Sequence, residues 1–193
     1  MVVAFVFMTI SSLSFRMRWK PANRNVTKFL HAMEWSIAGI CMIVGLIAVF
    51  MSHNDPTSGF IANLYSLHSW IGIIVVIFYS LQFLVGAFSF GCNIPKLNPL
   101  LKVRIMLIHR FVGSFIYFAA AITILLGIQE KEGFVNCSYA VTEPDLFPLS
   151  NFSKIPTSCK LSHSLGIITL FTALCTTFAM HEFNGASNTS RLE

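Results

Sequence analysis

Six histidines are spread through a strongly apolar sequence, and their spacing forms a pattern. They lie close to the ends of long hydrophobic runs, at positions His31, His53, His68, His109, His163 and His181. His31 and His53 flank one run, and the rise of a helix would separate them by about 33 Å. That distance is close to one bilayer thickness. The histidines therefore fall into two layers, one near each face of a membrane.

Two layers of imidazoles indicate a cofactor site. Ionisable residues inside membranes usually mark function, and imidazole is a good axial ligand for haem iron. We expect His31 and His109 to hold one haem near the cytoplasmic face and His68 to hold another near the outer face. Iron with two imidazole ligands has no open position, which suits electron transfer. For any single histidine, the alternative is capping or local hydrogen bonding.

Long apolar helices must position these histidines. Of the 193 residues, 55% are hydrophobic and 11% charged, against roughly 25% charged in soluble domains. Four runs are long enough to cross a membrane, at about 30–51, 69–90, 107–128 and 163–180. A fifth, residues 1–15, is shorter, and we interpret it as most of a helix whose start is missing.

The predicted fold class is all-α, an integral membrane helical bundle. It has four full transmembrane helices and one partial N-terminal helix, in a single domain over residues 1–193 with a cytoplasmic tail from about residue 181. We find no signal peptide, no low-complexity segment and no internal repeat.

The basic residues predict the orientation of these helices. Residues 16–28 hold five Lys and Arg, and residues 91–110 hold four, out of thirteen in the chain. Residues 52–67 hold none. Short loops rich in Lys and Arg stay in the cytoplasm, so the net charge of +5 reports topology rather than nucleic-acid binding.

The segment before the last helix is then expected to lie outside. It carries glycosylation sequons at Asn136 and Asn151. It also holds Cys137 and Cys159, which an oxidising compartment would allow to pair. The alternative is two chance sequons and two free thiols.

Three segments carry a resemblance to a known family. Residues 53–72, HNDPTSGFIANLYSLHSWIG, resemble the cytochrome b561 family of transmembrane ascorbate-dependent reductases. Residues 28–31, KFLH, are similar to the K-x-x-H opening of that family's third helix, and residues 107–113, LIHRFVG, to the opening of its fifth. The resemblance covers about residues 1–180. It implies a six-helix bundle with two haem b groups, of which one is assignable here.

The resemblance also implies roles for the histidines. His31 and His109 match the ligands of the cytoplasmic haem, and His68 matches one ligand of the outer haem. The family's second outer ligand would fall upstream of residue 1, so we expect an N-terminal truncation. The open alternatives are a fragmentary gene model, a true one-haem variant, or His163 as the substitute ligand.

The resemblance places ascorbate at the cytoplasmic face and its electron acceptor outside. Arg24 and Lys28 match basic positions of the family's ascorbate site, Lys102 stands where the family has Arg, and Arg104 is near enough to compensate. Ordinary positive-inside charge explains all four equally well. Glu34 shares the helix face of His31 and either orients a ligand or has no special role. The expected acceptor-side residues are His53, Asn63 and Tyr65.

The implied function is transmembrane electron transfer from cytoplasmic ascorbate to monodehydroascorbate or ferric iron outside. The alternative is a non-catalytic truncated isoform or membrane scaffold that binds at most one haem. The expected partners are membrane lipid, ascorbate and the acceptor, with a possible homodimer. The expected location is a multi-pass position in an endomembrane vesicle, lysosome or late endosome, or plasma membrane.

Overall fold

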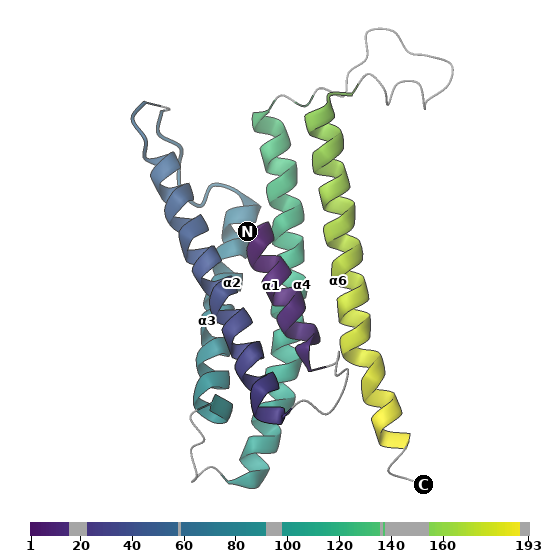
Figure 1. Ribbon diagram of the computed structural model, residues 1–193. Coiled ribbons are helices and arrows are strands. Elements are labelled where there is room, and N and C mark those ends of the chain that lie inside the picture. The colour runs from purple at the N-terminus through teal and green to yellow at the C-terminus, as the bar shows by residue number, and fades with distance from the viewer. Residues whose placement is uncertain (16–22, 58, 92–97, 136, 138–154, 190–193) are drawn as a thin grey trace, which may run out of the picture.

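The computed structural model describes residues 1–193 except 16–22, 58, 92–97, 136, 138–154 and 190–193. The described part is a bundle of helices without a strand (Figure 1). Its elements are α1 (Val2–Ser14), α2 (Arg24–His53), α3 (Leu67–Gly86), the π-helix η1 (Ala87–Gly91), α4 (Pro99–Phe134) and α6 (Thr157–Thr189).

The predicted all-α membrane bundle is confirmed. Within the described ranges, four segments are long and apolar enough to cross a membrane: Asn25–His53, Leu67–Gly91, Pro99–Phe134 and Thr157–Met180. The shorter apolar helix α1 accompanies them. Many large apolar side chains on these helices are exposed, Phe111 and Phe171 among them, as expected of surfaces that face lipid.

Polar caps start the helices outside the apolar runs. The Oδ1 atom of Asn23 accepts a hydrogen bond from the Asn25 N–H at 3.1 Å, and that of Asn98 accepts one from Leu100 at 3.0 Å. Pro99 follows Asn98 in the first turn of α4, where its missing N–H costs nothing. Each cap adds helical turns on the membrane-surface side of the span.

These added turns correct several predicted boundaries. His109 was expected at the start of its helix but lies ten residues after Pro99, and His31 lies seven residues after Arg24. Lys102 and Arg104, expected in a loop, belong to the first turns of α4. Helix α6 continues to Thr189, so the predicted tail begins as helix. Hydropathy marks the hydrocarbon span alone, whereas a capped helix continues through the headgroup region.

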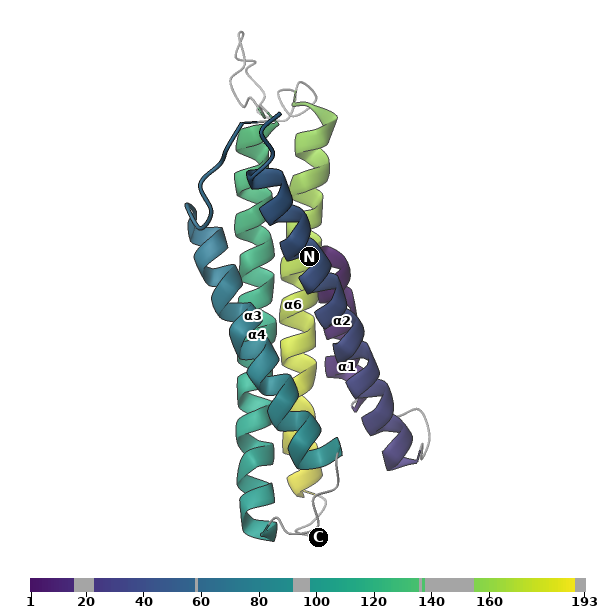
Figure 2. The same ribbon diagram turned by 90° about the vertical axis from the view of Figure 1, so that its left-hand side faces the viewer.

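The helices divide into two groups. Helices α1 and α2 pack against each other, while α4 packs between α3 and α6 (Figures 1 and 2). Helix α1 also reaches α4, where Phe5 stacks on the buried Tyr117 with ring centroids 4.9 Å apart. Thr9 and Tyr117 share a hydrogen bond of 2.8 Å. By contrast, α2 makes little contact with α3.

Candidate functional site

His31 is oriented by α1. Its Nδ1–H donates to the backbone carbonyl of Ser11 at 2.9 Å, and the Ser11 hydroxyl donates to the carbonyl of His31 at 3.1 Å. Ser11 is fully buried, so this pair is held inside the α1–α2 contact. A histidine whose Nδ1–H is held by a carbonyl presents its Nε2 as a ligand.

His109 lies on α4 at the level of the end of α3. Its ring packs against Gly86 and meets Phe90 of η1 edge to face, with centroids 5.8 Å apart. Helices α2 and α4, which carry His31 and His109, make little direct contact. Among the described residues, the buried Nδ1 of His109 has no hydrogen-bond partner.

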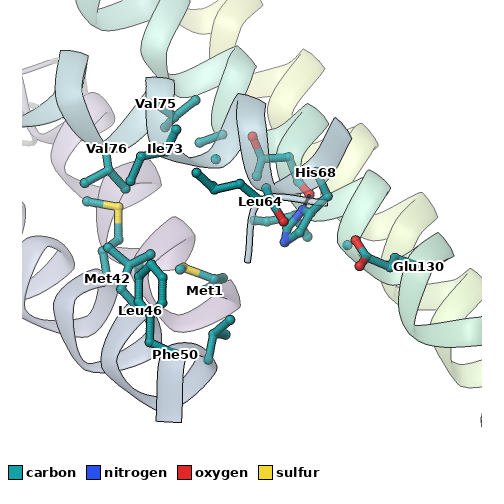
Figure 3. A pocket seen from close by; sticks show the side chains of 18 of the residues that line it. Met1, Met42, Leu46, Phe50, Leu64, His68, Ile73, Val75, Val76 and Glu130 are labelled. Atoms are coloured by element: carbon teal, nitrogen blue, oxygen red, sulfur yellow. Dashed lines mark hydrogen bonds between the residues drawn. The ribbon is translucent and has the colours of Figure 1, made fainter. Parts of the chain in front are cut away.

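His68 stands at the other end of the bundle. Its Nδ1–H donates to the carbonyl of Thr123 on α4 at 2.8 Å, and its ring packs against Gly127. The Nδ1 hydrogen bond leaves Nε2 as the ring nitrogen available to a ligand. It lines a cavity of about 260 Å³. Figure 3 shows His68 and Glu130 facing Met1, Met42, Leu46 and Phe50 across this space.

The three predicted acceptor-side residues line the same cavity as His68. His53 Nδ1–H donates to the Asn63 side-chain oxygen at 3.1 Å, and the His53 and Tyr65 rings have centroids 6.1 Å apart. The structure thus joins the candidate ligand of the outer haem and the candidate acceptor residues in one place.

Glu130 completes this cavity, and the sequence did not single it out. Tyr65 donates its hydroxyl to one Glu130 oxygen, and Ser66 donates to the other at 2.9 Å. This hydrogen bond to a carboxylate raises the pKa of Tyr65 to about 12. Tyr65 therefore stays protonated throughout the physiological range. An acid at the end of a transmembrane run is the sequence signal that could have identified Glu130.

Glu130→Gln should lower the pKa of Tyr65 from about 12 toward the ordinary tyrosine value of about 10, because the amide carries no charge. The measurement is the alkaline titration of tyrosinate ultraviolet absorbance, with Tyr65→Phe subtracted to isolate this residue. A Tyr65 titration that is the same in Glu130→Gln and the parent would show that the hydrogen bond does not form.

The remaining predicted residues are placed less closely together. His163 lines a different pocket between α4 and α6, with its Nε2 3.3 Å from a Glu132 oxygen, so the structure does not bring it to His68. Lys28 and Lys102 are partly buried and Arg104 is exposed; the Arg24 side chain, Asn136 and Asn151 lie outside what the structure describes.

The two cysteines of the predicted external segment form a disulfide. Cys137 and Cys159 are joined with their Cα atoms 5.9 Å apart. The bond ties the end of α4 to the first turn of α6, at the end of the bundle that holds His68. Cys41 and Cys175 are free thiols on helices.

The donor set fits a haem. His31 and His68 both have Nδ1–H held by a backbone carbonyl, which leaves Nε2 for iron. The His68 and His109 rings rest on glycines that leave room for them. Among the described residues, no hydrogen bond to the buried Nδ1 of His109 competes with a ligand for that ring. His31 and His109 would thus hold one haem, and His68 would contribute to a second.

Residues 1–135 match the family model described as eukaryotic cytochrome b561. The chain belongs to this family. A plasma membrane ascorbate-dependent reductase CYBRD1 of Xenopus laevis is 33% identical over 168 residues, which cover 86% of the chain and 54% of the relative. The transmembrane ascorbate-dependent reductase CYB561 of Homo sapiens is 36% identical over 146 residues, covering 75% and 56%.

A plant relative extends the comparison. The ascorbate-specific transmembrane electron transporter 1 of Zea mays is 38% identical over 117 residues, covering 61% of the cytochrome b561 chain and 48% of the relative. The chain therefore spans about half the length of the curated relatives it matches.

Proposed function

We propose that this cytochrome b561 chain carries electrons across a membrane, from ascorbate on the cytoplasmic side to monodehydroascorbate or a chelated ferric ion on the other. The observation that carries the proposal is the placement of His31, His68 and His109 at two levels of one bundle, each with a ring held by a neighbouring helix. The relatives named above as ascorbate-dependent reductases support the choice of donor.

Haem b would supply one-electron chemistry when held by these imidazoles. Neighbouring helices hold the rings of His31 and His109 in fixed orientations at the cytoplasmic level. Rings held in this way would move little when the iron gains or loses an electron. His68 does the same at the outer level. The two levels are separated by about 27 Å of helix, taking 1.5 Å for each of the 18 residues from His109 to Gly127.

Basic residues would attract ascorbate to the cytoplasmic level. Ascorbate is an anion at neutral pH, and Lys28 lies one turn before His31 on α2. Lys102 occupies the first turn of α4, the helix that carries His109. These two partly buried cations flank the level at which the donor must approach.

At the outer level, the chain offers hydrogen-bonding groups for an acceptor. His53 offers the ring nitrogen that does not bond Asn63 to an acceptor, as a hydrogen-bond partner or a metal ligand. Asn63 fixes the His53 ring, and Glu130 fixes Tyr65. This arrangement suits a small polar acceptor at the mouth of the His68 cavity.

Replacing Lys28 with alanine should raise the ascorbate concentration for half-maximal haem reduction about tenfold, the equivalent of ~1.4 kcal/mol, because one cation of the donor site is lost. The measurement is stopped-flow haem reduction by ascorbate. Lys28→Arg should retain most of the response. Lys131→Ala, at the opposite end of α4, is the matched control and should behave like the parent.

Loss of bound haem in Lys28→Ala would contradict the ascorbate role and make Lys28 structural. A purified chain that stays colourless after expression with ample haem would overturn the proposed function itself and favour a non-catalytic scaffold.

A further inference from the structure

Two glycines lie closer to histidine rings than a side chain would allow. A Cβ atom added to Gly86 on α3 would be 2.9 Å from Cε1 of His109 on α4. A Cβ atom added to Gly127 on α4 would be 2.7 Å from Cε1 of His68 on α3. Each helix thus supplies both a histidine and the glycine on which the other helix's histidine rests.

The same pattern occurs twice in the sequence with an offset of 41 residues. Helix α3 carries His68, Gly72 and Gly86, and α4 carries His109, Gly113 and Gly127 at the same spacing. This pattern corrects the expectation of no internal repeat, which failed because the similarity rests on a few positions in each copy. Because α3 and α4 pack antiparallel, the histidine of each helix lies beside the last of these glycines on the other helix.

The intermediate positions interact across the same interface. Gln82 on α3 donates its amide to the carbonyl of His109, and the equivalent Thr123 on α4 accepts from His68. A Cβ atom added to Gly72 would be 3.4 Å from Thr123, and one added to Gly113 would be 3.3 Å from Gln82. A small adjustment would accommodate either. The approach is closest only where a glycine faces a histidine.

We propose that Gly86 and Gly127 are positioning residues that set the ring orientation of His109 and His68, respectively. The inference deepens the proposed function, on which its spectroscopic part rests. A methyl group at either position must move the imidazole rather than the backbone, because a side-chain ring rotates more easily than a helix backbone shifts. In His68 that movement would also strain the hydrogen bond to Thr123.

General close packing of helices is the alternative, since glycine is common at membrane helix contacts. Close packing predicts that an added methyl group destabilises the contact between α3 and α4 whether or not the histidine is present. The positioning role predicts that the methyl group destabilises the protein only when the facing histidine ring is present. Gly133 on α4 faces open space, so Gly133→Ala is a control that changes the same residue type without a clash.

A double-mutant cycle on the purified protein separates these explanations. Gly86→Ala should lower the melting temperature by at least about 3 °C in a chain of this size, yet should cause no further loss in His109→Ala, where the ring is gone. Gly127→Ala should show the same dependence on His68. Equal losses with and without the histidine would overturn the inference, even if the chain carried no haem.

The second readout is ring orientation at the iron. In the ferric protein, Gly86→Ala should shift the low-spin electron paramagnetic resonance signal and the midpoint potential that His109→Ala abolishes, because ligand geometry tunes both. Gly127→Ala should shift only the signal that His68→Ala abolishes. Gly133→Ala should match the parent. Parent-like signals in both folded, haem-loaded glycine variants would overturn the inference, whereas absence of haem from the parent would count against the proposed function instead.

Discussion

Replacing His109 with alanine is expected to abolish the fast reduction of the chain by ascorbate. The ring packs on Gly86 and Phe90 at the proposed cytoplasmic level, and alanine leaves no donor for iron. Removing a direct ligand should weaken haem binding by more than about 100-fold, the upper end of the loss caused by outer-shell changes. Haem content and stopped-flow ascorbate reduction measure the effect. His31→Ala should behave in the same way.

His163→Ala is the control for this experiment. His163 lies beside Glu132 in a separate pocket between α4 and α6, so its loss should leave haem content and ascorbate reduction unchanged. Retention of the fast ascorbate response in both His31→Ala and His109→Ala would rule out these two residues as ligands of the cytoplasmic haem.

Replacing His68 with alanine should separate the two halves of the reaction. His68 lines the outer cavity, far from the level of His109. We expect ascorbate to reduce the cytoplasmic haem at close to the parent rate. Haem binding at the outer level should fall by more than about 100-fold, and transfer across a sealed vesicle to an external ferric chelate should fail with it.

The comparison requires oriented vesicles with ascorbate trapped inside and ferric citrate outside. Asn63→Asp is a useful companion, since it alters the His53 contact without touching His68 and should retain the haem content of the parent. Transfer across the membrane at the parent rate in His68→Ala would show that the outer level is not part of the electron route.

Hydropathy and charge were sufficient to predict the helices, because a membrane imposes a long apolar run on each span. They could not predict where the helices start, since the caps at Asn23 and Asn98 lie outside the apolar runs. For that reason His109 was placed at a helix end instead of ten residues inside α4.

The candidate site was only partly predictable. The two layers of histidines and the pairing of His31 with His109 follow from sequence spacing, and the family resemblance added the ascorbate and acceptor roles. The roles of Glu130, Gly86 and Gly127 depend on the antiparallel register of α3 and α4, which places each glycine beside a histidine far away in the sequence. A single residue of slippage would remove these contacts without changing composition or hydropathy.

The most direct test is the visible and electron paramagnetic resonance spectrum of the purified chain, expressed with ample haem, before and after ascorbate. We expect a red protein whose ferric iron is low-spin with two nitrogen ligands from His31 and His109, and whose visible bands sharpen within the mixing time of ascorbate. A colourless protein, or a cytoplasmic haem, the one lost in His109→Ala, that keeps an open coordination position in the parent chain, would contradict electron transfer through iron held between α2 and α4.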